Sequence, residues 1–503
     1  MKSLFQLIAS LDKGEKRYIK IYSSRHIIMG NSNDMELFDA ISKLQNPTDE
    51  SLKAVLGDSK IVKHLSLYKH ILYKNLLRCL NSYHTGKNIE DEILDLYKSS
   101  RVLYNKCLYN DAKKLIKKAR KLALDNESLG LYSFLREAET QIQERQFDLQ
   151  EFKESILDSA DEQREQTKKT IEYLQLRQIS NEIYYQSRIW GVVDEELSNR
   201  HSPQKALAEF EKINKSLQSD RAKMLAWKVS SLLACGKQDF KSSTEHELKI
   251  LKTLEGKPDD YPGKTEEILV TLHRISWNYY VLRDHKKLDK ILQRIRKMDD
   301  ASSSIALIKF QLFINYELLA KVNQNHGPSA DELEKKIEGF YATSSHALGA
   351  QRMLIINYNL AILFFVEGNF QKCEKWLNRV LENVNKKVHT DILISSRLLQ
   401  LTLKYEMGLY PLIKYVALST KRYIKKLRPL KGFEMQLFNT LIKLSSTKDE
   451  LKRKKILMKF HEDMVEYKKQ AKPLDIAFSF ELWAKSKITN VPLRKVFDKE
   501  VRH

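Results

Sequence analysis

The chain of 503 residues is 42% hydrophobic and 30% charged, a balance that is typical of globular proteins and excludes extensive disorder. With only 15 glycines and 9 prolines, turn residues are scarce, which favours long helices, and no stretch keeps the alternation of a strand. The formal net charge of +22 favours acidic proteins, polyanions or anionic surfaces as partners. The composition predicts an all-α protein.

The first 90 residues predict four helices. One is opened by Asp12, with Glu15 three residues later, which is the spacing of a capping box. We expect these helices to cover the apolar face of a following helical array. The other three helices are expected at residues 34–45, 49–57 and 60–84.

A helical hairpin pattern follows and recurs. Residues 360–381, LAILFFVEGNFQKCEKWLNRVL, hold two apolar helical stripes separated by Gly-Asn. Small Ala361 and Cys373 allow the two helices to approach closely, and Gly368 permits the turn. The pattern recurs at residues 100–119 and 276–295, and weaker units place second helices at 203–213, 239–251, 331–340 and 410–424.

These spacings resemble those of tetratricopeptide repeat (TPR) proteins over about residues 90–430. The period, about 40 to 45 residues, exceeds the standard 34, and Cys107 replaces the usual glycine. The stretch SLDKGEKRYIKIY is also similar to the N-terminus of uncharacterised bacterial TPR-like proteins. The resemblance implies a right-handed α-solenoid of antiparallel helix hairpins. Its expected parts are an N-terminal helical cap (1–90), TPR-like repeats (91–430) and a C-terminal helical cap (431–503).

The resemblance also implies a partner-binding groove, because TPR proteins bind partners along a concave surface formed by the first helix of each hairpin. Rigid aromatic rings in such a groove would anchor an extended or helical peptide. The alternative is that each aromatic packs in the core against neighbouring helices. Carried onto the best-matched units, the groove positions are Tyr97, Arg101, Tyr104, His273, Trp277, Tyr280, Tyr358, Ile362 and Phe365.

Two basic runs, KKLIKKARK at 113–121 and LKRKKILMK at 451–459, suit phosphate contacts. Both also carry apolar residues at helical spacing, so each alone is better explained as a solvated helix face, and the summed positive charge is what favours phosphate contacts. The proposed basic patch consists of Lys113, Lys114, Lys117, Lys118, Lys452, Arg453, Lys454 and Lys455.

Motifs that carry chemistry are absent from the sequence. It contains no glycine-rich phosphate loop, no His-Glu-x-x-His and no Gly-x-Ser-x-Gly. We therefore predict no catalytic residues, no metal site and no cofactor, and we expect a protein that is not an enzyme.

The cysteines and the N-terminus bear on the compartment. Four widely separated cysteines lie among apolar neighbours, which is typical of buried free thiols in a reducing compartment. The chain shows neither a signal peptide pattern nor an apolar run long enough to span a membrane. We expect a cytoplasmic protein.

The expected function is that of a scaffold or adaptor that holds a protein or peptide in its concave groove, with basic patches favouring acidic or nucleic-acid-containing partners. The alternative is a nucleic-acid-binding or transcription-regulatory protein whose TPR-like repeats act as a sensor. Salt distinguishes the two, because phosphate binding weakens steeply as salt rises. No oligomeric state is predicted.

Overall fold

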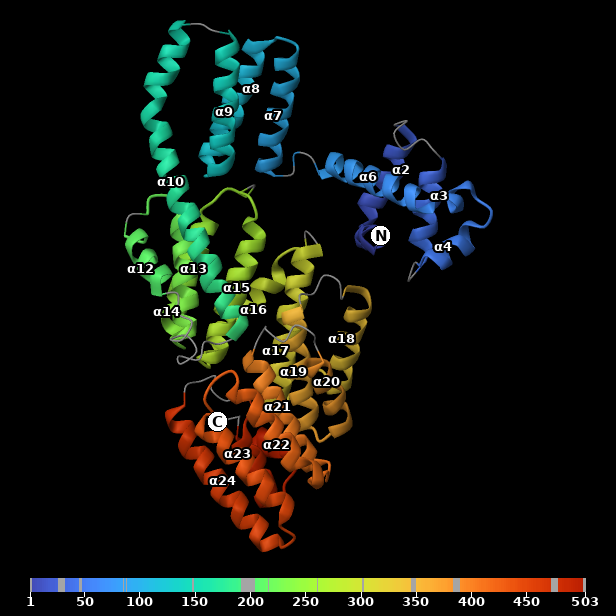
Figure 1. Cartoon of the computed structure of the whole chain (residues 1–503), viewed down its shortest axis with the longest axis vertical. Helices are drawn as coiled ribbons and strands as arrows, with labels where there is room; N and C mark the ends of the chain where they lie inside the picture. The colour runs from blue at the N-terminus through green and yellow to red at the C-terminus, as the bar shows by residue number, and fades with distance from the viewer. Residues whose placement is uncertain are drawn as a thin grey trace. The chain divides into compact units, whose positions relative to one another are not determined.

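The computed structural model describes residues 2–25, 32–44, 48–84, 86, 88–146, 149–190, 204–215, 217–259, 261–300, 303–344, 350–382, 390–471 and 478–500. Every regular element in these ranges is a helix, so the all-α prediction is confirmed there (Figure 1). The helices are α1 (Lys2–Ser10), α2 (Lys13–Arg25), α3 (Ser32–Lys43), α4 (Asp49–Leu56), α5 (Lys60–Lys63), α6 (Leu65–His84), α7 (Ile89–Asn105), α8 (Tyr109–Asp125), α9 (Leu129–Gln146), α10 (Leu149–Trp190), α12 (Gln204–Ile213), α13 (Asp220–Gly236), α14 (Phe240–Glu255), α15 (Lys264–Val281), α16 (His285–Lys297), α17 (Ser303–Gln324), α18 (Ala330–Ser344), α19 (Ala350–Val366), α20 (Phe370–Leu381), α21 (Thr390–Glu406), α22 (Tyr410–Lys425), α23 (Gly432–Ser446), α24 (Glu450–Gln470), α25 (Phe480–Thr489) and α26 (Leu493–Glu500).

The chain divides into two compact units. Unit 1 comprises Met1–Thr167 with Pro258–Lys264, and unit 2 comprises Lys168–Lys257 with Thr265–His503. The boundary at residue 167 falls inside α10, which therefore contributes to both units. The division into caps and repeats at residues 90 and 430 stays a prediction.

The N-terminal helices of unit 1 enclose their own core. The predicted capping box is confirmed: the Glu15 N–H donates to Asp12 Oδ1 at 2.7 Å, and the Asp12 N–H donates to Glu15 Oε2 at 2.9 Å. The long helix expected at 60–84 is broken into α5 and α6 at His64, whose N–H bonds to the Ile61 carbonyl three residues back. Apolar side chains of α1 to α6 fill this core, among them Leu4, Ile19, Phe38, Leu52, Leu72 and Cys79.

One turn geometry recurs at six helix–helix connections of the described residues. The turn residue has a positive φ, and the N–H of the following residue bonds to the carbonyl five residues back, which is the long bond of a Schellman motif. The next helix begins directly after it. The turn residues are Cys107, Glu127, Gln238, Arg283, Gly368 and Gly408, and the six bonds, 2.8 to 3.0 Å long, are Leu108 to Leu103, Ser128 to Ala123, Asp239 to Ala234, Asp284 to Tyr279, Asn369 to Phe364 and Leu409 to Lys404.

Close contacts between the two helices of a hairpin occur at fixed numbers of residues before and after the turn residue. Ser100 lies seven residues before Cys107, and Ala112 lies five residues after it. The Ser100 hydroxyl donates a hydrogen bond to the Ala112 carbonyl at 2.8 Å. At the same offsets from Gln238, the Ser231 and Ser243 hydroxyls lie 3.0 Å apart. The hairpins α7–α8, α13–α14, α15–α16, α19–α20 and α21–α22 thus share one turn position, which is consistent with a helical solenoid.

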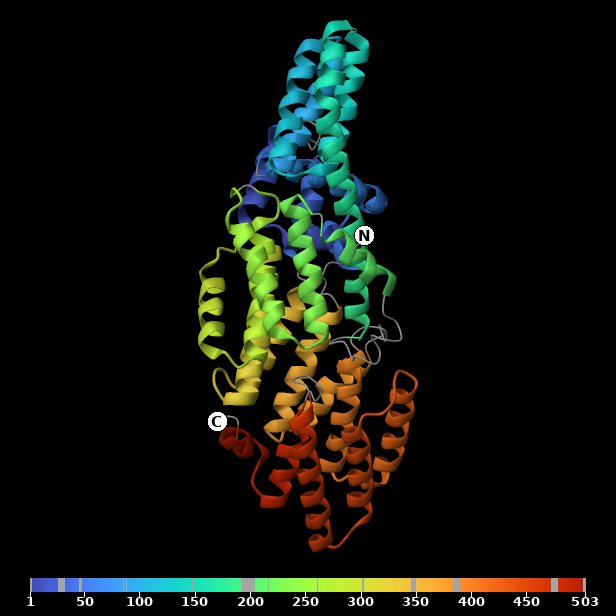
Figure 2. The same ribbon diagram turned by 90° about the vertical axis from the view of Figure 1, so that its left-hand side faces the viewer.

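The largest core of unit 2 runs from Ile314 to Phe497 without a break near residue 430. Consecutive helices from α19 to α25 contact one another, and α21 also contacts both α19 and α23. Figure 2 shows α21 to α24 lying side by side. Trp376 and Trp483 are the bulkiest side chains buried in this core.

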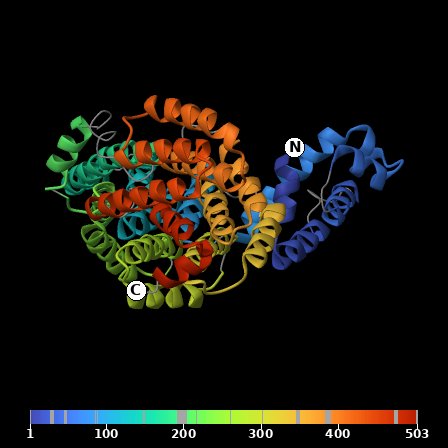
Figure 3. The same cartoon turned by 90° about the horizontal axis from the view of Figure 1, so that it is seen from below.

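The C-terminal segment does not simply extend this row. Helix α25 packs against α24, and the indole N–H of Trp483 donates to Glu406 Oε1 of α21 at 2.7 Å. Helix α26 instead contacts α17 and α19, where Arg494 Nη1 donates to the Lys321 carbonyl at 2.9 Å. Figure 3 shows the red C-terminal end returning to these helices.

Candidate partner-binding site

The three groove positions predicted on α19 are buried. Tyr358, Ile362 and Phe365 are 4%, 7% and 1% exposed and belong to the main core of unit 2. The Phe365 ring meets that of Phe478 edge to face, with centroids 5.3 Å apart. Because Phe478 and the nearby α26 cover this part of α19, these side chains are core residues and do not line an open groove.

The groove positions predicted on α7 are half-buried and share a face with α9. The Tyr97 ring packs edge to face against that of Phe134 on α9, with ring centroids 4.7 Å apart. The Phe134 side chain is exposed. The Arg101 guanidinium lies 4.7 Å above the Tyr104 ring. A hydrogen bond to Tyr104 raises the pKa of Arg145, which extends from α9. This face of unit 1 therefore remains open and aromatic.

The positions predicted on α15 are also half-buried. Trp277 stacks on Tyr280 with ring centroids 5.7 Å apart, and the Tyr280 hydroxyl accepts a hydrogen bond from Asn323 of α17 at 2.7 Å. Burial raises the pKa of Tyr280 to about 12, so its hydroxyl stays protonated. His273 lies one turn before Trp277 and is likewise half-buried. Trp277 and Tyr280 form a fixed aromatic pair.

Basic side chains of α10, α13 and α15 interact with one another and with shared neighbours, and the sequence pattern did not predict them. The guanidinium groups of Arg177 on α10 and Arg221 on α13 both lie over the Tyr173 ring, 5.4 and 5.6 Å from its centroid. Lys228 of α13 lies 3.8 Å from Glu267 of α15. Burial lowers the pKa of Lys228, and the charges of Arg274 and Arg177 lower it further. The cation cluster is defined as Arg177, Arg221, Lys228 and Arg274.

A buried polar network holds Arg274 in place. Its Nη1 lies 3.1 Å from Glu247 Oε2, and Glu247 is fully buried. The Ser231 hydroxyl donates to Glu247 Oε1 at 2.6 Å, and the Asn278 amide donates to the Ser243 hydroxyl at 2.9 Å. Because the carboxylate is fixed by these bonds, the guanidinium is fixed with it. Arg274 is therefore the preorganised member of the cation cluster.

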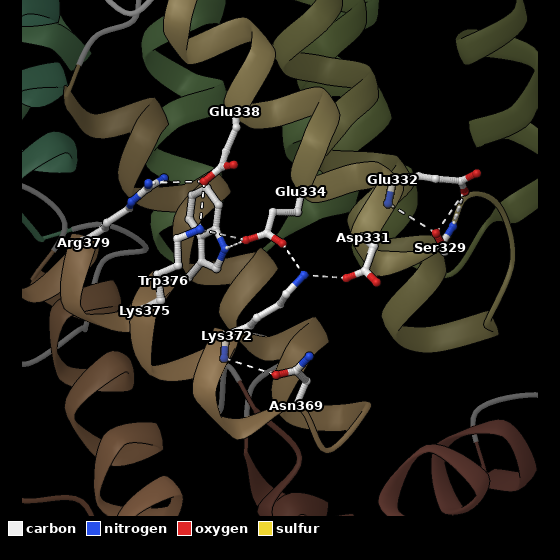
Figure 4. Close-up of polar contacts among 10 residues, drawn as sticks. All are labelled: Ser329, Asp331, Glu332, Glu334, Glu338, Asn369, Lys372, Lys375, Trp376 and Arg379. Atoms are coloured by element: carbon white, nitrogen blue, oxygen red, sulfur yellow. Dashed lines mark hydrogen bonds and ion pairs between the residues drawn. The ribbon is translucent and has the colours of Figure 1, made fainter.

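A second charged network joins α18 to α20 and lies outside the predicted sites. The indole N–H of Trp376 donates to Glu334 Oε1 at 2.8 Å, and Lys372 Nζ bridges Glu334 Oε2 and Asp331 Oδ1 at 2.6 and 2.7 Å. The Arg379 guanidinium lies 4.2 Å above the Trp376 ring. Figure 4 shows the acids on α18, Asp331, Glu334 and Glu338, alternating with the bases on α20, Lys372, Lys375 and Arg379. Because the acids and bases of this network pair with one another, the network fits a structural role.

Only part of the basic run on α8 is available for contact with a charged partner. Lys113 is 5% exposed because it borders the helix face, centred on Ala112 and Ile116, that packs in the core. Lys114 and Lys118 pair with Asp111 and Glu92 at 3.0 and 3.3 Å, whereas Lys117 is exposed. Lys113 is thus removed from the predicted patch.

The basic run on α24 is more open. Arg453 is half-buried, donates to the Thr447 carbonyl at 2.6 Å and lies over the Tyr410 ring, so it contributes to packing. Lys452 is exposed and only 3.9 Å from Asp449, and Lys454 and Lys455 are exposed on the helix surface.

Within the described residues, these features define an all-helical protein with recurring hairpins and with half-buried aromatic side chains on α7 and α15. Protein-family models, curated proteins and solved structures yield no match to the chain. Within the described ranges, no helix has the length and apolar character needed to cross a membrane. The same part of the chain holds no group of His, Cys, Asp and Glu arranged to bind a metal.

Proposed function

We propose that the protein is a non-enzymatic TPR-like scaffold that binds an acidic segment of a protein partner along the faces of α10, α13 and α15. The observation that supports this function best is the cation cluster, whose Arg274 lies three residues, about one helical turn, before Trp277 of the Trp277–Tyr280 pair. The proposal includes the right-handed sense of the array, the capping role of the terminal helices and a cytoplasmic location.

Binding would combine two kinds of contact. Carboxylates of the partner would take the place of water around Lys228 and Arg274, and charge attraction would speed association. An apolar side chain of the same segment would lie against the ring of Trp277, which is one helical turn from Arg274. Because Glu247 already holds Arg274, little side-chain entropy is lost on binding.

A peptide selection tests this function. A random peptide library would be selected on the intact protein, and the affinity of enriched peptides measured by fluorescence anisotropy. We expect acidic peptides with an apolar anchor, and Lys228→Met should weaken their binding about tenfold, or 1.4 kcal/mol. Lys286→Met, which removes an exposed charge from α16, is the matched control and should leave the affinity unchanged. Equal affinities for wild type and Lys228→Met would contradict the proposal.

Nucleic-acid binding is a second candidate, and exposed Lys117, Lys454 and Lys455 favour it. It predicts that the logarithm of the affinity for a nonspecific duplex falls linearly with the logarithm of salt concentration, and that each lysine removed makes the slope shallower by about 1. A slope unaffected by Lys454→Gln plus Lys455→Gln would exclude these residues from phosphate contact.

A further inference from the structure

Helix α24 exposes an apolar stripe on a face separate from its core face. Leu451, Met458 and Val465 are 74%, 45% and 39% exposed, and they follow one another at intervals of seven residues. Seven residues are close to two helical turns, so the three side chains lie along one face of the helix. The core face of the same helix is occupied by Leu457, Phe460 and Met464. Helix α24 is therefore apolar on both faces.

The stripe lies on the last long helix of the row that runs from α19 to α25. Helix α24 contacts α23 and α25, and the chain then leaves this region because α26 packs on α17 and α19. A helical array needs a polar outer face at its end to avoid exposing apolar surface to water. Large apolar side chains at regular spacing on an exposed helix are instead typical of a helix–helix seam.

Charges beside the stripe identify its occupant. Lys454 and Glu462 are both exposed, lie four residues before and four residues after Met458, and form no ion pair with another described residue. A parallel copy of α24 would place like charges together. In an antiparallel copy centred on Met458, Leu451 of one chain faces Val465 of the other, and Lys454 faces Glu462 twice.

We propose that α24 pairs with α24 of a second copy of this chain in an antiparallel, two-fold symmetric interface with Met458 at its centre. The stripe is symmetric about Met458, so each apolar residue finds an apolar partner. The acidic Glu462 disfavours an anionic membrane on this face, whereas it completes the charge pairing between two copies.

Sedimentation equilibrium of the full chain tests the proposal. The chain mass is 59.0 kDa, so we expect a concentration-dependent species of twice that mass. Met458→Glu places two carboxylates on the symmetry axis and should leave only monomer. Lys414→Glu, an exposed charge reversal on α22, is the matched control and should leave the dimer intact. Circular dichroism checks that each variant is folded.

A charge swap then tests the register. Lys454→Glu and Glu462→Lys should each weaken dimerisation about tenfold, and the double variant should restore it. A wild-type chain that stays monomeric up to about 100 μM would overturn the proposal, as would a dimer that survives Met458→Glu. A dimer that the double swap fails to restore would contradict the antiparallel register.

Discussion

The indole N–H of Trp376 donates a hydrogen bond to the carboxylate of Glu334 at 2.8 Å, joining α20 to α18. Burial disfavours the ionised form of Glu334, but hydrogen bonds from Lys372, Trp376 and Lys375 outweigh it and hold the pKa below its ordinary value. The network thus stabilises the contact between two neighbouring hairpins only while Glu334 is ionised.

Glu334→Gln should lower the free energy of unfolding at pH 7 by about 2 to 3 kcal/mol, because it breaks charge-assisted hydrogen bonds in a nearly dry site. Since the folded-state pKa lies below the ordinary 4.5, this stability is fully present above pH 4.5. It is lost as the pH falls through the folded-state pKa, so the two proteins should converge in acid. Urea titrations at several pH values measure this difference. Glu338→Gln, at a more exposed position in the same helix, should cost much less.

The turn residues give a second prediction. Arg283 has a φ of 58°, a left-handed conformation that glycine adopts without steric cost. Arg283→Gly should therefore stabilise the protein by about 1 kcal/mol, and Gly368→Ala should destabilise it by a similar amount. A Cβ at Gly368 would meet no neighbouring atom within 4 Å, so the change reports backbone strain alone. Thermal unfolding measures both, and effects of the same sign would contradict a shared turn geometry.

Burial separates the aromatic groove candidates. Phe365→Ala should cost about 3 to 5 kcal/mol in unfolding free energy because it empties a filled core site. Tyr97→Ala removes a half-buried ring and should cost less than half as much. Chemical denaturation measures both variants, and equal losses would mean that Tyr97 is as much a core residue as Phe365.

The four thiols should differ in reactivity. The expected burial of all four thiols is wrong for Cys107, which is exposed at a turn between two helices. Cys79 and Cys373 are buried, and burial raises the pKa of Cys79 to about 11 and that of Cys373 further above its ordinary range. Because the thiolate is the reactive form, an aromatic disulfide reagent at pH 8 should modify one thiol rapidly. Cys107→Ser should abolish this fast phase. The half-buried Cys235, whose pKa is raised by burial, should react slowly, and Cys79 and Cys373 should react only after unfolding. A fast phase that persists in Cys107→Ser would contradict the assigned burial.

Local features of the fold were predictable from sequence. The turn at Gly368 and the capping box at Asp12 depend on residues within a few positions of each other, so the pattern contains the information. The hairpin at Cys107 was found despite the missing glycine because Ser100 and Ala112 keep the spacing.

Features that depend on contacts between distant parts of the chain could not be predicted from the sequence. Nothing near Phe365 indicates that Phe478 returns to cover it, because the two are brought together only by the path of the C-terminal segment. The cation cluster escaped notice for a similar reason: Arg177, Lys228 and Arg274 are 51 and 46 residues apart, and each alone is an ordinary helical charge. A spacing of about one repeat was the available signal, and it becomes informative only when the register of the helices is known.

The measurement that tests the central claim most directly is the affinity of one selected acidic peptide for the wild type and for Trp277→Ala plus Tyr280→Ala, at low and at moderate salt. If the face of α15 binds the partner, the affinity of the double variant should be at least about tenfold lower at both salt concentrations, because the lost contact is apolar. Near-wild-type affinity in a folded double variant would contradict the account.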